Sequence, residues 1–386
     1  MPHRRDFLKS LALVGAAATL PTHALFAQDK NIKLPKPIGN GLSPIRYHED
    51  IGRKKTPPRN ITIPDVGEYK IIKGDFHIHT LFSDGQVMPR DRVLEAVDNG
   101  LDVIAITDHI EYRPNIGSVN LKLADKNDDH NIAYNLAKDE AEKNNLILVR
   151  GTEITKAARH FNALFLQDVN PIAAVVNDWQ KMLAVATDQG GFIHWNHPGW
   201  VNRDANDPSG LKSGDPMRFF DEHEDLRKKG LLHGVEVFNY TTHYPIALDW
   251  CHERDLVPMV NSDVHESEWN LYGHQNPLRP MTLIFAKDRS YDSIREAFFS
   301  KRVVGWAANM VLGCSPWVEK LFRSCVEINR ATLRNLSDIP CVIEAEGTTV
   351  VLPPQGTAEI VSSKKLTVHN WFVGTNKPLV VVFESG

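Results

Sequence analysis

The stretch IIKGDFHIHTLFSDG, residues 71–85, decides the fold of this chain. An apolar run leads into His77 and His79, which are spaced i, i+2, and Asp84 follows five residues later. In a β-strand this spacing places both imidazoles on one face. A single His-x-His pair is a weak signal, because alternating polar residues are common in strands. The rest of the chain must therefore show whether these residues belong to a larger set.

Downstream of this stretch, short apolar runs alternate with helical patterns over some 230 residues. The alternation predicts parallel strands, most simply an α/β barrel. We expect strands over Ile72–Thr80, Asp102–His109, Ile147–Thr155, Phe161–Leu166, Gly191–His197, Gly234–Asn239, Val257–His265, Met281–Lys287 and Arg302–Trp306. We expect helices over Pro89–Asn99, Asn131–Asn144, Pro171–Gln189, Met217–Lys229 and Tyr244–Arg254. The segments Asp125–His130 and Asn202–Gly214 read as surface loops.

The pattern changes after Cys314 to short strands separated by turn residues, which predicts a small C-terminal β-sandwich. Its expected strands are Val342–Ala345, Thr348–Leu352, Ala358–Val361, Leu366–Val368 and Leu379–Phe383. The fold class is thus α/β, a barrel followed by a β-rich domain. The boundaries we expect are 71–313 for the barrel and 314–386 for the C-terminal domain, preceded by an extended, proline-punctuated leader over 28–70.

Almost every expected barrel strand ends in a residue type that binds metals. In a parallel α/β barrel these ends share one mouth, where the chemistry lies. Seven separate segments with this property are not plausibly accidental. The nine candidate ligands are His77, His79, Asp84, His109, Glu153, His160, His197, Asp263 and His265.

The segments HIHT…SDG, TDH, GTE, NHP and SDVH, in this order, resemble the PHP superfamily, named for polymerase and histidinol phosphatase. The resemblance covers about residues 72–313 and implies a distorted (β/α)7 barrel with three metals. It implies one metal held by His77, His79, Glu153 and Asp263. The second metal is also bound by Glu153, together with His160 and His197, and the third metal is bound by Asp84, His109 and His265. Asp84 stands where some relatives have His, which leaves the metal's identity open.

The ligand types agree with this resemblance. Imidazoles and carboxylates without thiolate suit zinc, manganese or iron. Two close cations that share a carboxylate can hold a hydroxide with a lowered pKa. Such a bridging hydroxide could attack phosphorus directly, so we expect an exported metal-dependent hydrolase of small-molecule phosphoesters, with diesters favoured over monoesters.

Candidates for catalytic residues other than metal ligands are His243 as a general acid, His194 as an alternative proton donor if its strand bulges, and Arg159 as a phosphoryl contact. Asp108 could orient a ligand imidazole or cap the following turn. Lys156, Arg203 and Arg279 are weaker candidates for substrate contact. Five aromatic residues in segments around the expected mouth suggest an apolar substrate group: Trp195, Trp200, Tyr240, Tyr244 and Trp269.

The N-terminus predicts export. Arg4-Arg5-Asp6-Phe7-Leu8-Lys9 precedes a short apolar run and closely resembles a twin-arginine signal, with cleavage expected near residue 27. We therefore expect a periplasmic or secreted protein that is a partner of the twin-arginine machinery and has no stable membrane insertion. Together with the GTEIT and NHPGW segments and the C-terminal β-domain, the signal resembles exported bacterial phosphodiesterases of the Sb-PDE type.

Composition narrows the alternatives. The 386 residues carry a net charge of −4, and the four cysteines include no CxxC pair. A nucleic-acid polymer is therefore a poor substrate candidate, and neither a disulfide framework nor a zinc ribbon is indicated. The open alternatives are a phosphomonoesterase on the same trinuclear site, an amidohydrolase-type barrel, and a non-catalytic periplasmic protein that binds metal or carbohydrate.

Overall fold

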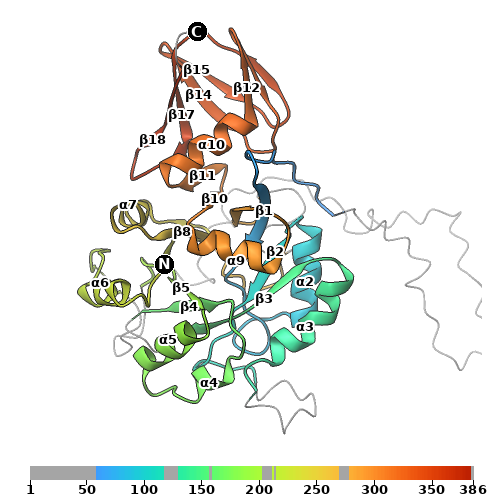
Figure 1. Ribbon diagram of the computed structural model, residues 1–386, viewed down its shortest axis with the longest axis vertical. Coiled ribbons are helices and arrows are strands. Elements are labelled where there is room, and N and C mark those ends of the chain that lie inside the picture. The colour runs from blue at the N-terminus through green and yellow to red at the C-terminus, as the bar shows by residue number, and fades with distance from the viewer. Residues whose placement is uncertain are drawn as a thin grey trace, which may run out of the picture. The chain divides into compact units, whose positions relative to one another are not determined.

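The computed structural model describes residues 58–116, 129–155, 159–201, 211–212, 214–268 and 278–383. They belong to one compact unit, Pro57–Gly386. The fold is mixed α/β with one large sheet, and helices lie around its strands (Figure 1). The predicted signal peptide, most of the leader, and the candidates Lys156, Arg203 and Trp269 lie outside the described residues. None of the described helices is both long and apolar enough to cross a bilayer.

The strands of the N-terminal two-thirds are β1 (Lys70–Asp75), β2 (Val103–Ile106), β3 (Ile147–Ile154), β4 (Phe161–Leu164), β5 (Phe192–Trp195), β6 (Gly234–Asn239), β7 (Thr242–His243), β8 (Val257–Asn261), β9 (Met281–Ala286), β10 (Val303–Ala307) and β11 (Met310–Gly313). The helices are α2 (Pro89–Asp98), α3 (Ile132–Lys143), α4 (Asn170–Ala173), α5 (Trp179–Asp188), α6 (Asp221–Lys228), α7 (Pro245–Arg254), α9 (Tyr291–Phe299) and α10 (Ser315–Cys325).

The sheet is mixed, so the expectation of uniformly parallel strands was wrong. β1, β2 and β3 are parallel, as are β5, β6 and β8, but β4 is antiparallel to both of its neighbours. The reason is the short link between β3 and β4, because parallel neighbours need a crossover of a dozen or more residues. β9 and β10 also run antiparallel to their neighbours.

β8, near one end of this series of paired strands, approaches β9 and β10 through side chains. Thr282 Oγ1 of β9 accepts from the backbone N–H of Val260 on β8 at 3.1 Å and donates to the Val260 carbonyl at 2.9 Å. Gly305 of β10 lies against the same valine, where a Cβ would come within 1.9 Å of its Cγ2. Phe298 of α9 packs edge-on against Phe76, which follows β1, and against Phe192, the first residue of β5.

The C-terminal strands join the same large sheet, because β17 pairs with β11 in parallel. They are β14 (Cys341–Ala345), β15 (Thr348–Leu352), β17 (Lys365–Phe372) and β18 (Pro378–Val382). A separate three-stranded sheet contains β12 (Val326–Asn329), β13 (Thr332–Asn335) and β16 (Thr357–Glu359). Figure 1 shows these orange and red strands gathered at one end of the unit.

Two boundaries matter for the site. β1 ends at Asp75, so His77 and His79 follow the strand and do not lie within it, contrary to the expectation. β8 likewise ends at Asn261, before Asp263 and His265. An isolated parallel bridge between Ile78 and Val264 nevertheless keeps these two segments side by side.

The expected helix over Pro171–Gln189 is two helices. α4 ends at Ala173, and a new helix begins after Asp178, whose side chain accepts from the backbone N–H of Lys181 as the N-cap of α5.

Candidate metal centre

The structure brings eight of the nine candidate ligands into three overlapping clusters. Within each cluster, one nitrogen or oxygen atom from every residue lies within 4.8 Å of the others. The clusters are His79–Asp84–His109–His265, His77–Glu153–His197 and His77–His79–Asp263. The third cluster contains three of the four ligands that the family resemblance implies for one metal. The other two differ from the implied grouping, because His79 also joins Asp84, and His77 joins His197.

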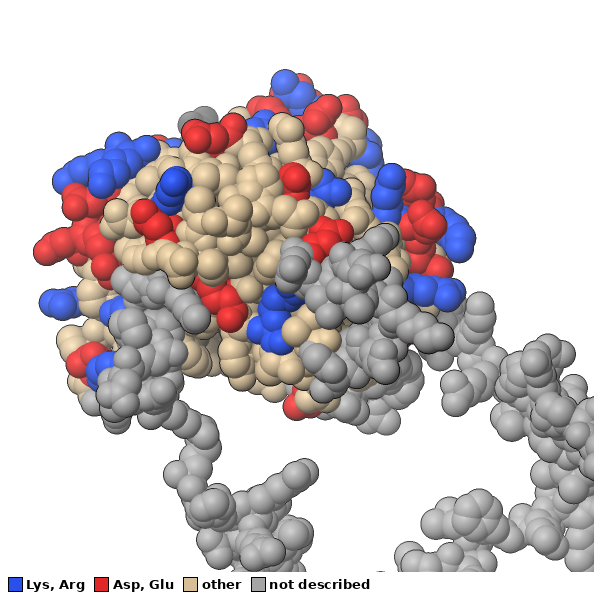
Figure 2. Space-filling model, turned by 90° about the horizontal axis from the view of Figure 1, so that it is seen from below, with Lys and Arg blue, Asp and Glu red and all other residues tan. Residues whose placement is uncertain are grey.

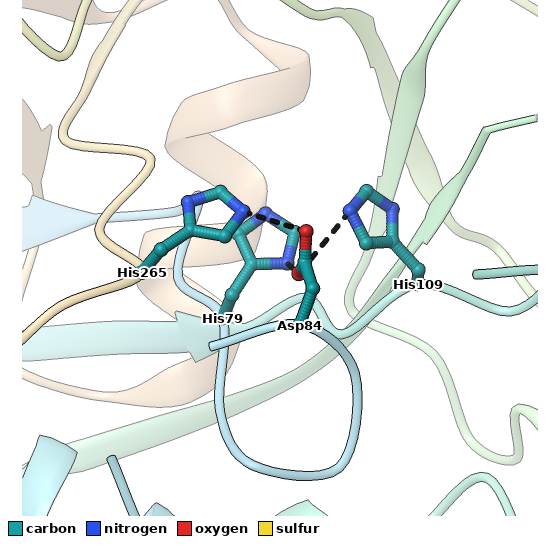
Figure 3. Close-up of side chains that lie close together, drawn as sticks. All are labelled: His79, Asp84, His109 and His265. Atoms are coloured by element: carbon teal, nitrogen blue, oxygen red, sulfur yellow. Dashed lines mark ion pairs between the residues drawn. The ribbon is translucent and has the colours of Figure 1, made fainter. Parts of the chain in front are cut away.

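Figure 3 shows the first cluster, in which three imidazoles surround the Asp84 carboxylate. Asp84 Oδ2 lies 3.2 Å from His265 Nε2, and Oδ1 lies 3.5 Å from His109 Nε2 and 3.6 Å from His79 Nδ1. Gly85 allows this approach, since a Cβ there would come within 2.6 Å of the His79 backbone. We therefore attribute the SDG motif to the close packing of this loop on the His79 segment.

Glu153 is the centre of the second cluster. It is buried, and its carboxylate lies 3.3 Å from His77 Nε2, 3.1 Å from His109 Nδ1 and 3.6 Å from His197 Nε2. Asn196 donates to Glu153 Oε1 at 2.8 Å. Burial opposes ionisation, but His109 and His77 hold the pKa of Glu153 well below its usual range.

His160, the ninth candidate, belongs to none of the three clusters but contacts Glu153. Its Nδ1 lies 3.0 Å from Glu153 Oε1, and its buried Nε2 has no hydrogen-bond partner among the described residues. An imidazole nitrogen left without a partner in a buried site is available for a metal. His160 thus lies where it could complete the second cluster.

The donor set fits cations. His265 Nδ1 donates to the Asp263 carbonyl at 2.9 Å, so in the neutral ring Nε2 carries a lone pair, yet it faces Asp84 Oδ2. A lone pair opposite a carboxylate is repulsive unless positive charge lies between them. Although burial opposes the charge, Asp263 and Glu153 raise the pKa of His79 to about 10. The carboxylates here therefore stabilise positive charge, as a divalent cation requires.

Two ligand candidates have left-handed backbones, which is unusual for residues other than glycine. His197 has φ 27° and Asp263 has φ 51°. Such conformations cost of order 1–3 kcal/mol and persist only where surrounding contacts fix them. For His197 one such contact is the bond from its backbone N–H to Glu236 Oε2 at 2.7 Å.

A pocket of about 740 Å³ opens directly over the clusters. Seven candidate ligands line it, and His77 and His79 lie beneath. Trp200, Tyr240 and Tyr244 line it as expected from the sequence, and Tyr112, Glu111, Thr155 and Glu266 are additions that sequence reasoning missed. Glu111 and Tyr112 follow His109 by two and three residues, so their place after the TDH motif was an available signal.

The other predicted catalytic residues do not line this pocket. His194 is fully buried, and burial lowers its pKa to about 4. His243 lies on β7 with its ring 6.3 Å from that of Phe372. The Arg159 guanidinium stacks 4.2 Å over the Phe220 ring.

Three further candidates make contacts that hold the fold together. Arg279 is fully buried and pairs with Asp75 at 2.7 Å. Trp195 is fully buried and stacks on Trp250. Asp108 accepts from Thr80 and Ser83, so it fixes the loop after His79, and it reaches the His79 ring through the Ser83 hydroxyl, which lies 3.4 Å from Nδ1.

The comparisons with known proteins agree with this geometry. The PHP domain model matches residues 75–202, and a model of the twin-arginine translocation signal matches residues 1–21. The signal indicates export to the periplasm or out of the cell. No curated protein gives a significant match.

Among solved structures, one is a two-domain protein from Bacteroides vulgatus that contains a predicted PHP-like metal-dependent phosphoesterase. It is 32% identical, with 84% of this chain and 98% of that chain covered and a TM-score of 0.75. PsfC from Pseudomonas syringae is 16% identical, with 66% and 96% covered and a TM-score of 0.41. Since this chain spans nearly the whole of the Bacteroides relative, it belongs to the PHP family of metal-dependent phosphoesterases.

Proposed function

We propose that this protein is an exported phosphodiesterase that hydrolyses small-molecule diesters. It would use three divalent transition metals per chain, which would be zinc, manganese or iron. The observation that carries the proposal is the pocket of about 740 Å³ over the ligand clusters, with aromatic side chains at its rim. This volume is in the range of sites for drug-sized ligands, so it has room for substituents on both sides of a phosphodiester.

The metals would be held by His77, His79, Asp84, His109, Glu153, His160, His197, Asp263 and His265. When bound, they would supply Lewis acidity that neutralises phosphoryl oxygens and activates water. The chain's own contribution is to hold the carboxylates ionised and to orient the imidazoles. Asn196 orients Glu153, and the Asp263 carbonyl fixes the proton of His265 on Nδ1.

The aromatic rings flank the ligands on two sides. The Trp200 ring lies 4.9 Å from that of His160 and 5.7 Å from that of His197, while the Tyr112 ring lies 5.8 Å from that of His109. Trp200, Tyr112 and Tyr240 are 38%, 53% and 40% exposed. Exposed rings beside a metal centre can hold apolar ester groups by contact. A diester has two such groups, and a monoester has one.

The charge of the pocket also favours a diester. Its described lining includes Glu111 and Glu266 but no lysine or arginine. A monoester dianion needs more positive charge beyond the metals than a diester monoanion does. Arg159, which the sequence suggested for this role, lies outside the pocket lining.

We also propose the finer architecture that the sequence suggests: a twin-arginine signal peptide over 1–27, a leader over 28–70, a distorted (β/α)7 barrel over 71–313 and a β-sandwich domain over 314–386. The Thr282–Val260 bonds between β9 and β8 support barrel closure. The sandwich is supported by the three-stranded sheet, which is separate from the C-terminal strands of the large sheet.

The test compares an aryl phosphodiester with the matching aryl monoester, using one leaving group and one metal. We expect a higher kcat/KM for the diester. Trp200→Ala should lower the diester-to-monoester ratio by about 5- to 30-fold, which corresponds to about 1–2 kcal/mol of lost contact.

The matched control is Phe299→Ala, because Phe299 is equally exposed, at 38%, but lies outside this pocket. A clear preference for the monoester would replace the diesterase proposal with the phosphomonoesterase alternative. Metal binding without hydrolysis of either ester would favour a non-catalytic role.

A further inference from the structure

Arg92 is a buried cation of α2 with 0% exposure, and it binds the backbone of the metal centre. Its Nε donates to the His79 carbonyl at 2.9 Å. Its Nη2 donates to the carbonyls of His265 at 2.7 Å and Val264 at 3.2 Å, and its Nη1 donates to that of Glu266 at 2.8 Å. One guanidinium thus binds four carbonyl groups that belong to two separate segments of the chain.

These two segments carry three of the four ligands of the His79–Asp84–His109–His265 cluster: His79, Asp84 and His265. They lie beyond the ends of β1 and β8, where only an isolated bridge pairs them. The His79 N–H donates to the Val264 carbonyl at 3.0 Å, and the Gln86 N–H donates to that of His265 at 2.7 Å. Without a strand ladder, the position of the His265 and His79 side chains depends on such contacts, and Arg92 makes four of them.

Glu236 of β6 contacts the His77–Glu153–His197 cluster in a similar way. It is also fully buried. Its Oε1 accepts from His77 Nδ1 at 2.9 Å and from Asn261 at 2.8 Å. Its Oε2 accepts from the His197 N–H at 2.7 Å and from Asn239 at 2.8 Å. The carboxylate therefore fixes the proton of His77 on Nδ1 and directs the lone pair of Nε2 into the His77–Glu153–His197 cluster.

Neither residue lines the substrate pocket, and the contacts of the two do not overlap. We propose that Arg92 and Glu236 are positioning residues that support the two clusters separately: Arg92 supports the His79–Asp84–His109–His265 cluster and Glu236 supports the His77–Glu153–His197 cluster. The proposal rests on the metal centre of the proposed function. It means that one part of the centre can lose affinity while the other remains loaded.

The test is metal binding to the full-length mature chain, stripped with a chelator and titrated with Mn²⁺ or Zn²⁺ against a competing indicator. Arg92→Lys keeps the charge, but a single ammonium cannot reach all four carbonyls. We expect it to weaken the His79–Asp84–His109–His265 site by about 10- to 100-fold and to leave the His77–Glu153–His197 site at wild-type affinity. Glu236→Gln should weaken the His77–Glu153–His197 site by a similar factor. The His77–His79–Asp263 site shares a ligand with each of these clusters and can respond to either change.

Two comparisons assign each effect to its cluster. In a His265→Ala background, Arg92→Lys should leave the His77–Glu153–His197 site unchanged, whereas Glu236→Gln should still weaken that site. Glu95→Gln is the matched control, because it removes the ion pair with Arg92 Nη1, at 2.7 Å, and leaves the four carbonyl contacts in place. We expect wild-type metal affinities for it.

The proposal is overturned if Arg92→Lys weakens the His77–Glu153–His197 site, if Glu236→Gln weakens the His79–Asp84–His109–His265 site, or if a folded Arg92→Lys variant binds all metals as the wild type does. If Arg92→Lys does not fold, Arg92→Met with Glu95→Gln removes both charges together and serves in its place. These affinities need no turnover. A chain that binds metals with this pattern but hydrolyses no phosphoester would therefore contradict only the proposed function.

Discussion

At the scale of single residues, a group of buried charges around Arg279 affects the free energy of unfolding. Arg279 pairs with Asp75 at 2.7 Å and donates to Glu268 at 3.2 Å, and all three are buried. Burial raises the pKa of Glu268 to about 7, although Arg279 opposes that shift. Removing one partner from such a network leaves an uncompensated buried charge, which is usually costly.

The raised pKa of Glu268 predicts a pH-dependent stability. The folded protein binds this proton more tightly than the unfolded chain, whose glutamates titrate near 4.5. The stabilisation is therefore complete below about pH 4.5 and is lost as the pH rises through about 7. Its full size is about 3 kcal/mol. Glu268→Gln should remove this part of the slope, measured as the free energy of unfolding in urea at pH 5 and pH 8.

Exposed Glu253→Gln is the control for that experiment and should keep the wild-type slope. An unchanged slope in Glu268→Gln would show that this carboxyl is ionised in the folded protein at both pH values.

The candidate ligands that the structure brings together form a pattern in the sequence, whereas the residues that contact them from below do not, for a physical reason. A ligand set repeats one residue chemistry at the end of each successive strand, so its members are visible as a pattern. Glu236 and Arg92 act through contacts with residues more than 100 positions away along the chain, such as His77 and His265. Nothing local distinguishes them from an ordinary strand glutamate or helix arginine.

At the scale of elements, the sequence predicted β6 at its observed bounds and most helices to within a few residues, but it missed α10. That helix has Pro316 in its first turn and buries Val318, Leu321, Phe322 and Cys325, a helical i, i+3, i+4, i+7 spacing. The signal was present, but it lies where the surrounding pattern had changed to short strands. β4 was predicted as a strand, but its antiparallel direction was missed, because that direction depends on the length of the preceding loop and not on the residues of the strand.

The contact between β8 and β10 gives a prediction about packing. Because a Cβ at Gly305 would come within 1.9 Å of Val260 Cγ2, Gly305→Ala should destabilise the fold by about 1–3 kcal/mol. Val260→Ala removes the obstructing methyl groups. The double variant should therefore be less destabilised than the sum of the two single changes, measured by urea unfolding as a double-mutant cycle. Additive effects would mean that the two strands do not pack as described.

At the scale of the whole molecule, the surface is consistent with a small substrate. The net charge is −4, and acidic and basic side chains lie intermixed on the face that Figure 2 shows. A protein that binds a nucleic-acid polymer usually carries a basic face. The specificity we propose therefore depends on the pocket and its aromatic rim.

Export through the twin-arginine pathway gives the last prediction. The signal model matches residues 1–21, and its paired arginines are Arg4 and Arg5. Changing both to lysine keeps the charge of the segment but removes the arginine pair that the pathway recognises. We expect this variant to remain in the cytoplasm as the uncleaved precursor, detected by fractionation and immunoblotting. Lys9→Arg also keeps the charge and retains both arginines, so it should be exported normally. Periplasmic accumulation of the Arg4→Lys, Arg5→Lys variant at the wild-type level would instead assign the segment to a general secretory signal.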